Sequence, residues 1–532
     1  MITVDYDIIK QDGFSRKGIF LCLLLIGIIG LLVRLYFEPP SALTGDATNY
    51  FLYAADTGLK GKLSDVYFLA NSGWSVLLSA LFSITKYDDP LFLMELQRSL
   101  SIFISVVTII PVYFLCRRFF NQSYSLIGAS LFLFQPHIII NSSLGITEPL
   151  FLFLGISSLT LFLNNNHKIV YASFAVMGLF TLIRFEGLLF FAMLSIMFFV
   201  KYRNEKRYFL RYPLVLAIYV LVLLPVAYSN FETHERDGFV SELFDTSLAS
   251  YQRFIEGKPD IGDQLYGDAS SSNMQNFLTI GIKNTIWFSG IAAIPLFVFF
   301  VPMGIILIIK NKNNLKIDFK IVTVILVSIT MLIPAFYSYA RDSEDVRYLF
   351  MIFPLLVLIS LYGVSKWKIK NHHLMMVGII TAIILTSFLY LDFKKIDYDY
   401  ENEVFLIAQF ITSKTNIIND NSADIRYRMT AAVVTYWPDL PTPTSEFKPE
   451  ILQIISPIGY NSLIEFVDLS KDKGLTHLAV DGRDHQPEFL RDVFYHDEKY
   501  VYLTKVFDSK DHGMSYHVKI FKIDYNKVKN YL

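Results

Sequence analysis

Long apolar runs follow one another through the first three quarters of the chain. Most approach the roughly 20 residues that a helix needs to cross a bilayer core of about 30 Å. The runs within 149–200 are short for full spans, which leaves tilted or re-entrant helices open, and a still shorter run at 74–85 indicates an interfacial helix or a re-entrant segment. The pattern predicts about eleven spans, at 19–37, 99–116, 123–141, 149–163, 168–183, 187–200, 212–228, 285–309, 320–337, 347–365 and 373–391.

The end of the chain has a different pattern. Residues 392–532 contain no apolar run long enough to span a membrane, and residues 403–412 have the periodicity of a helix. Alternating stretches predict strands at 476–481, 500–507 and 516–523. The fold class is therefore an α-helical polytopic membrane protein with a small C-terminal α/β domain. The predicted domains are a transmembrane domain at 1–391, with outer loops at 38–97 and 229–284, and an α/β domain at 392–532.

The distribution of basic residues predicts the orientation, because cytoplasmic loops are enriched in lysine and arginine. With the N-terminus in the cytoplasm, the inside segments hold 18 basic residues in 55 positions, and the outside segments hold 10 in 136. An odd number of spans then places residues 392–532 on the extracytoplasmic side. The inside segments are 1–18, 117–118, 164–168, 201–211, 310–320 and 366–373.

The composition agrees with a membrane protein and excludes other classes. Hydrophobic residues make up 53% of the 532 positions and charged residues 18%, below the roughly 25% of soluble chains. A disordered chain, a coiled coil and an ordinary soluble enzyme are therefore excluded. The net charge of −1 gives no basic field for nucleic acid. Two cysteines exclude a disulfide scaffold and a cysteine-rich metal site.

Charged residues gather at the outer ends of the predicted spans. Ionisable residues at membrane depth are costly and mark functional sites by default, so we expect one polar site at the outer face. The alternative is that loop ends are simply polar. It explains Arg184 and Glu186 less well, because the connection at 184–186 is too short to form a loop that would hold both charges in water. The residues at this depth are Arg34, Asp46, Glu148, Arg184, Glu186, Arg341, Asp342, Glu344, Asp345 and Arg347.

Asp46 is the candidate with the most specific chemistry. It follows Gly45, which can form a tight turn, and it precedes a helix-like run. One interpretation makes Asp46 a helix N-cap. The other makes it a carboxylate at the membrane face that accepts a proton from a nucleophile or binds a divalent metal.

Short motifs at these outer ends follow one another in order. Arg34 precedes Asp46, and Tyr50 and Ala54 follow Asp46 at intervals of four residues. The later motifs are Ser72-Gly-Trp-Ser-Val-Leu-Leu78, Thr147-Glu-Pro-Leu-Phe151, Gly178-Leu-Phe-Thr-Leu-Ile-Arg-Phe-Glu-Gly187 and Val346-Arg-Tyr-Leu-Phe-Met-Ile-Phe-Pro354. Together, over residues 20–365, they resemble the GT-C class of integral membrane glycosyltransferases. They are most similar to the protein-O-mannosyltransferase and aminoarabinose-transferase branch.

The sequence also departs from this family pattern. Ala47 stands where the family has a second acid, so the loop lacks a pair of carboxylates for a metal. Ser72 and Ser75 stand where the family has prolines. A Trp-Trp-Asp-Tyr-Gly motif is absent from the sequence, which disfavours an oligosaccharyltransferase of that pattern.

The resemblance implies a sugar donor linked to a polyprenyl phosphate and an inverting transfer at the outer membrane face. Arg184, Arg347 and Arg341 would clamp the donor phosphate, since guanidinium pairs with phosphate in a bidentate manner. Asp46 would be the general base, and Glu148 would be the second acid in place of Ala47. The remaining substrate-binding residues implied are Arg34, Tyr50, Glu186 and Tyr348.

Several alternatives stay open at this point. Protein, lipid and glycan acceptors fit equally well, and the sequence does not decide whether a divalent metal takes part. Glu148 also fits a carboxylate favoured by the helix dipole, and Glu186 also fits a simple ion-pair partner of Arg184. The main rival function is a transporter or flippase of lipid-linked sugars, although the sequence shows no repeated halves and its charges gather at one face. A membrane-anchored binding protein would not explain the charged outer ends of eleven spans.

Overall fold

The computed structural model places the chain in two compact units. It describes residues 15–39, 42–43, 45–65, 69–70, 72–85, 89–245, 248, 274–310, 318–341, 343–367, 372–395, 397–415, 417–435 and 453–529. The first unit comprises residues 1–38, 62–78 and 98–395, and the second comprises 39–61, 79–97 and 396–532. The second unit thus combines the predicted α/β domain with two segments of the predicted first outer loop.

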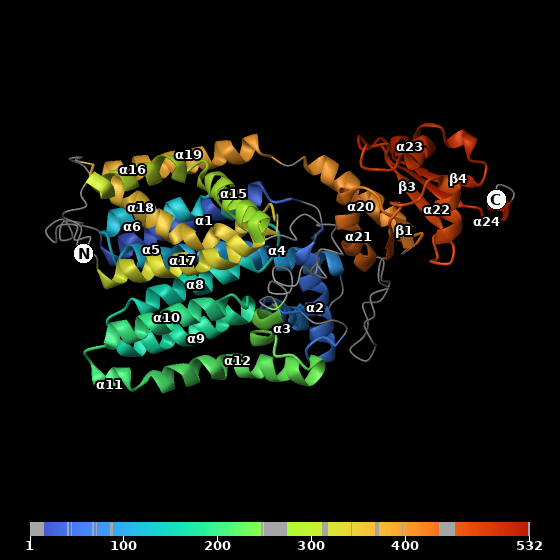
Figure 1. The fold of residues 1–532 in the computed structure, drawn as a ribbon. Coiled ribbons are helices and arrows are strands. Elements are labelled where there is room, and N and C mark those ends of the chain that lie inside the picture. The colour runs from blue at the N-terminus through green and yellow to red at the C-terminus, as the bar shows by residue number, and fades with distance from the viewer. Residues whose placement is uncertain are drawn as a thin grey trace. The chain divides into compact units, whose positions relative to one another are not determined.

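The first unit is built from helices that run side by side (Figure 1). Apolar side chains from most of them form one buried core. Its helices are α1 (Arg16–Tyr36), α5 (Ile109–Cys116), α6 (Gln122–Leu133), α7 (Pro136–Ser142), α8 (Glu148–Phe162), α9 (His167–Ile183), α10 (Gly187–Tyr202), α11 (Lys206–Phe209), α12 (Tyr212–His234), α15 (Met274–Ala293), α16 (Phe297–Lys310), α17 (Phe319–Ala340), the 3-10 helix η3 (Val346–Ile352), α18 (Phe353–Ser365) and α19 (His372–Phe393). Two further helices, α3 (Gly73–Thr85) and α4 (Pro90–Val107), each have residues in both units.

The structure confirms a polytopic helical membrane protein. Six helices among the described residues are long and apolar enough to cross a bilayer, or up to eight if each of two bent pairs counts as one span. Every predicted run contains a helix, but α8, α9 and α10 have only 15, 17 and 16 residues. At 1.5 Å per residue, such helices reach about 22–26 Å, less than the bilayer core of about 30 Å. The predicted count of eleven spans is therefore not confirmed.

Two predicted spans are broken helices. The run at 285–309 was predicted as one span, but α15 and α16 are bent by 107° where Pro295, which lacks a backbone N–H, interrupts the helix. The run at 123–141 bends by 54° between α6 and α7, where Pro136 starts a new helix. The side-chain amide of Gln135 donates to the Ala292 carbonyl at 2.6 Å, and this hydrogen bond links the two broken helices close to their bends.

The predicted outer loop at 229–284 is shorter in the structure. Helix α12 continues to His234, and α15 already begins at Met274. The helices therefore take up both ends of the predicted loop. Most of the chain between them lies outside the described residues.

The second unit contains the predicted α/β fold. Its five strands, in the order β2-β1-β3-β5-β4, are β1 (Ile417–Asn419), β2 (Gln453–Ile455), β3 (His477–Val480), β4 (Leu503–Asp508) and β5 (Lys519–Ile523). β1 pairs in parallel with β2 and β3, whereas β5 pairs antiparallel with β3 and β4. The helices of this unit are α2 (Asp46–Lys60), α20 (Tyr398–Thr412), α21 (Ala423–Thr435), α22 (Leu463–Ser470), α23 (Glu488–Tyr495) and α24 (Tyr525–Val528), with short 3-10 turns at Asp497–Lys499 and Ser509–His512.

These elements correspond to the predicted ones. The predicted strands 476–481 and 516–523 contain β3 and β5, the predicted strand 500–507 overlaps β4, and the predicted helix 403–412 lies within α20. Apolar side chains of α22, α23 and the sheet form a separate buried core, including Phe466, Leu478 and Leu490. The predicted boundary at residue 391 falls inside α19, which continues to Phe393.

The orientation remains a prediction with a direct test. We expect a reporter fused after Lys395 to be active only outside the cytoplasm, because the basic residues favour a cytoplasmic N-terminus. The measurement compares the activities of two reporters fused at this position, one that is active only in the cytoplasm and one that is active only outside it. Activity of the cytoplasmic reporter at this position would contradict the orientation.

Candidate active site

Four charged residues of the predicted site meet in the first unit. Glu148 is the first residue of α8, Arg184 and Glu186 lie in the turn between α9 and α10, and Arg347 lies in η3. These residues come from three distant parts of the sequence. We call the hollow that they border the polar pocket.

Arg184 is the central charge of the polar pocket. Its Nη1 donates to Oε1 of Glu148 at 2.8 Å, and its Nη2 donates to Oε1 of Glu186 at 2.7 Å. Its Nε also faces both carboxylate oxygens of Glu186, at 3.2 and 3.3 Å. All three side chains are largely buried, so water screens these ion pairs little. Arg184 is thereby held in one orientation by two carboxylates.

Arg347 is held less tightly on the other side of Glu148. Its Nη1 lies 3.8 Å from Oε1 of Glu148, and its Nε lies 3.1 Å from Oδ2 of Asp345. Asp345 also caps η3 by accepting from the backbone N–H of Arg347 at 2.9 Å. The Tyr339 hydroxyl donates to the Asp345 carbonyl at 2.9 Å and fixes this loop to α17. Arg347 thus has a defined position between Glu148 and Asp345.

The polar pocket is small, with a cavity volume of about 30 Å³. Its apolar wall consists of aromatic side chains and of residues from α17, and the Arg184 guanidinium lies 5.6 Å from the centre of the Phe151 ring. The N-termini of α8 and α10 both lie at this site, and helix N-termini favour negative charge. The lining residues are Glu148, Phe151, Leu152, Arg184, Glu186, Met331, Pro334, Ala335, Arg347, Tyr348, Phe350 and Met351.

Close packing beneath the pocket depends on small residues. A Cβ atom on Gly155 would lie 2.8 Å from the Phe180 ring and 2.9 Å from the Met351 methyl group. A Cβ atom on Gly187 would lie 2.5 Å from the Thr181 hydroxyl. The glycine in the Arg184-Phe-Glu186-Gly187 motif therefore allows α10 to start directly against α9.

Arg34 lies away from the polar pocket. Its side chain is completely buried, and among the described residues its guanidinium donates hydrogen bonds to neutral groups only. The acceptors are the hydroxyls of Ser105 and Ser142, at 3.0 and 3.2 Å, and the carbonyls of Gly30 and Leu133, at 3.0 Å each. These contacts join α1 to α4, α6 and α7. Because the guanidinium is already satisfied by these groups, we leave Arg34 out of the proposed donor site.

The remaining predicted arginine and tyrosine differ in position. Tyr348 lines the polar pocket, with its ring 5.5 Å from the Arg347 guanidinium. Arg341 follows the last residue of α17, lies 5.8 Å from the Tyr337 ring, and is not among the pocket-lining residues. Asp342 lies outside the described residues.

Asp46 and Tyr50 belong to the second unit. Gly45, with φ of 52°, is the N-cap of α2, and Asp46 is the first helical residue. The interpretation of Asp46 as an N-cap is therefore wrong, because glycine supplies the turn. The Asp46 side chain is exposed, whereas Ala47 and Tyr50 are buried. The buried side chain of Gln97 donates to the Ala47 carbonyl at 2.9 Å and fixes the backbone beside Asp46.

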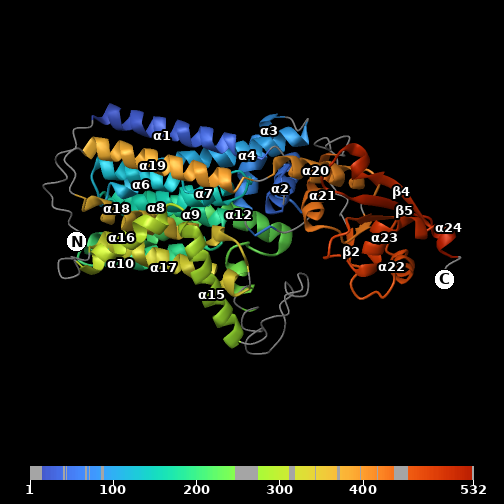
Figure 2. The same cartoon turned by 90° about the horizontal axis from the view of Figure 1, so that it is seen from above.

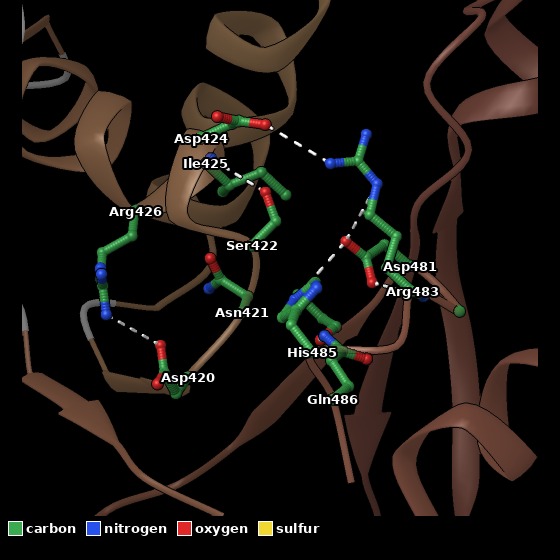
Figure 3. A network of polar contacts seen from close by, with 12 residues as sticks. Asp420, Asn421, Ser422, Asp424, Ile425, Arg426, Asp481, Arg483, His485 and Gln486 are labelled. Carbon is green, nitrogen blue, oxygen red and sulfur yellow. Dashed lines mark hydrogen bonds and ion pairs between the residues drawn. The ribbon is translucent and has the colours of Figure 1, made fainter. Parts of the chain in front are cut away.

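The second unit also contains a polar network that was not predicted from the sequence. It follows the carboxyl ends of β1 and β3, and Figure 3 shows Asp481, Arg483 and His485 facing Ser422 and Asp424. Arg483 donates to the Tyr400 hydroxyl at 3.0 Å and lies over the Tyr516 ring at 4.5 Å. Burial and the hydrogen bond to Asp424 raise the pKa of Tyr400 to about 12. The available signal was the polar residues at the end of the predicted strand 476–481, where open α/β sheets place functional groups.

The part of the chain that the structure describes offers no donor set for the metal interpretation. Among the described residues, no three His, Cys, Asp or Glu side chains are grouped so that they could hold a metal ion. In the loop of Asp46, the neighbouring position is Ala47, which offers no ligand atom. We therefore derive no step through a metal.

Replacing Arg184 by alanine is expected to destabilise the protein by about 3–5 kcal/mol, because two buried carboxylates lose their shared cation. Thermal unfolding in detergent is the measurement. Adding Glu148→Gln and Glu186→Gln to Arg184→Ala should recover part of the loss. Equal stability of the wild type and Arg184→Ala would show that the ion pairs are not structural.

Comparison with known proteins supports the fold but no family by sequence. No family model matches the chain, and no curated protein matches it. Among solved structures, ArnT from Cupriavidus metallidurans bound to undecaprenyl phosphate is similar over 96% of this chain and 98% of its own, with a TM-score of 0.54 and 10% identity. The oligosaccharyltransferase AglB from Archaeoglobus fulgidus, in complex with an inhibitory peptide and a dolichol-phosphate, is similar over 93% of this chain and 73% of its own, with a TM-score of 0.53 and 13% identity.

Both similar structures are GT-C class membrane proteins. The chain therefore has the GT-C fold, as the motifs predicted. At identities of 10% and 13%, this likeness shows the fold and not the substrate. The function has to be argued from the site.

Proposed function

We propose that the protein is a membrane glycosyltransferase that moves a sugar from a polyprenyl-phosphate donor to an acceptor at the outer membrane face. The observation that carries the proposal is the polar pocket, which joins two arginines to an apolar wall within a GT-C fold. The structures with a similar fold also support the proposal, because AglB was solved with a dolichol-phosphate and ArnT with undecaprenyl phosphate. A lipid phosphate combines the same two properties, an anion and an apolar chain.

Arg347 is the better candidate for the first contact with the phosphate. Arg184 already donates to Glu148 and Glu186 through all three of its nitrogens, whereas Arg347 pairs with the half-exposed Asp345 at 3.1 Å and lies 3.8 Å from Glu148. Guanidinium binds phosphate in a bidentate manner, and the contact strengthens as charge develops on the leaving phosphate. Arg184 would add its charge from the far side of Glu148.

This arrangement changes the role that we propose for Glu148. It was predicted as a second catalytic acid, but its Oε1 faces both guanidiniums. A carboxylate in that position keeps two like charges close together. We therefore assign Glu148 and Glu186 to holding the arginines, and Tyr348 to the wall beside the sugar phosphate.

Asp46 is proposed as the general base on the strength of its motif. Its carboxylate would take the proton from an acceptor hydroxyl or amine as that group attacks the anomeric carbon. The bond between the anomeric carbon and the phosphate oxygen breaks, and the polyprenyl phosphate leaves with the electron pair. Attack opposite the leaving phosphate inverts the anomeric centre. Tyr50 and Arg341 are retained as proposed substrate contacts.

The experiment uses the purified full-length protein in proteoliposomes with a radiolabelled polyprenyl-phosphate sugar. The proposal predicts consumption of the donor, with release of polyprenyl phosphate and transfer to an acceptor or to water. Movement of intact donor across the bilayer without consumption would instead support a transporter or flippase. Candidate acceptors to be added separately are a peptide, a lipid and a glycan, and hexose and pentose donors are compared.

A further inference from the structure

An apolar groove runs along the outside of the first unit, separate from the polar pocket. It lies between α1 and the helices α4 and α5 and has a volume of about 650 Å³. Figure 2 shows α1 along an edge of the helix bundle. The groove is lined by Arg16, Ile19, Phe20, Leu23, Leu24, Gly27, Ile28, Leu31, Phe103, Val106, Val107, Ile109, Ile110, Tyr113, Phe114 and Arg117.

The charges of this groove are confined to one end. Helix α1 begins at Arg16, and α5 ends at Cys116, one residue before Arg117. The two arginines are the only charged lining residues, and every other lining side chain except Tyr113 lacks a polar group. Among the described residues, neither arginine forms an ion pair, although Nη1 of Arg117 donates to the Phe120 carbonyl. The groove therefore offers positive charge at its head and an apolar surface along its length.

The length of the groove matches one leaflet of a bilayer. From Arg16 to Leu31, α1 rises about 22 Å at 1.5 Å per residue. Half of a bilayer core is about 15 Å thick, and the headgroup region of one leaflet adds several ångström to that thickness. Several large apolar side chains in the groove are exposed, including Phe20, Phe103 and Phe114. A single leaflet lipid has the right length to cover them, whereas a second helix would need a partner for the arginines as well.

We propose that this groove binds an anionic phospholipid, with its phosphate at Arg16 and Arg117 and an acyl chain along α1. Basic pockets between membrane helices on the cytoplasmic side are a general means of binding anionic headgroups. With the orientation proposed above, the lipid lies in the cytoplasmic leaflet, on the side of the membrane opposite the proposed transfer reaction. The inference does not depend on that reaction, because it uses none of the residues of the polar pocket.

The experiment measures lipid binding to the delipidated full-length protein by native mass spectrometry. The probes are phosphatidylglycerol and phosphatidylcholine with the same acyl chains. We expect one phosphatidylglycerol to bind more tightly than phosphatidylcholine, by on the order of 30-fold for two basic residues near the headgroup. The double variant Arg16→Gln/Arg117→Gln should lose this preference.

Two further variants test whether the effect is specific to the groove. Arg203→Gln/Arg207→Gln is the matched control, because both arginines are exposed on a predicted cytoplasmic segment and do not line the groove. Gly27→Leu should fill the groove and weaken both lipids, since a Cβ atom there lies in ordinary contact with Val106 at 3.7 Å. An unchanged preference in the arginine variant would overturn the proposal. A dimer that Gly27→Leu dissociates would also overturn it, by showing that a second copy covers the groove.

Discussion

Asp46→Asn is expected to abolish sugar transfer while leaving the protein folded. Asparagine keeps the size of the side chain but cannot accept a proton, and loss of a general base typically lowers the rate by about 10²–10⁴. The structure sharpens this test, because Gly45 and not Asp46 is the N-cap of α2. The substitution removes a favourable charge from the first turn, worth about 0.3–1 kcal/mol. The measurement is the transfer rate at saturating donor, together with the unfolding temperature.

The control for this prediction is Asp65→Asn. Asp65 is another exposed carboxylate of the predicted first outer loop, and it pairs with Lys62 at 3.1 Å. It should retain the wild-type rate. If Asp46→Asn also transferred sugar at the wild-type rate, Asp46 would not be the base, and Glu148 would become the first alternative.

Arg347→Ala is expected to weaken use of the donor by about 2–5 kcal/mol, the cost of removing one partner of a desolvated charge pair. That corresponds to a loss of about 30-fold or more in kcat/KM for the lipid-linked sugar. Arg347 is a cleaner test than Arg184, because Arg184 is tied to two buried carboxylates and its loss also affects stability. The measurement is kcat/KM as a function of donor concentration.

Two variants show whether the geometry of the guanidinium matters. Arg347→Lys keeps the charge but not the bidentate geometry, so it should recover only part of the activity. Arg236→Ala removes a half-exposed arginine that pairs with Glu242 and Asp245, and it should behave like the wild type. Normal donor kinetics in a folded Arg347→Ala protein would mean that the phosphate binds elsewhere.

The sequence could predict the helices and the core of the pocket because both rest on strong local signals. Apolar runs of bilayer length have few alternatives to a helix, and each predicted run is helical in the structure. Glu148, Arg184 and Arg347 could be grouped because the alternation of spans assigns all three to one face of the membrane. That grouping needs only topology and no knowledge of the packing.

Other features could not be read from the sequence because they depend on contacts between distant segments. Arg34 shares the predicted depth of the pocket residues, but Ser105, Ser142 and two carbonyls surround it. The bend between α15 and α16 depends on how the chain packs after Pro295, which could equally have kinked one long helix. The network at Asp481 and Arg483 requires β1 and β3 to pair, a contact across about sixty residues.

The most direct test of the proposed function is a structure of the protein with a polyprenyl phosphate. The account predicts density for the phosphate within hydrogen-bonding distance of the Arg347 guanidinium, at about 2.7–2.9 Å from nitrogen to oxygen. The lipid chain should leave the polar pocket along its apolar wall. A phosphate bound only outside the pocket, for example at Arg16 and Arg117, with the pairs between Arg184, Glu148 and Glu186 intact, would contradict the account.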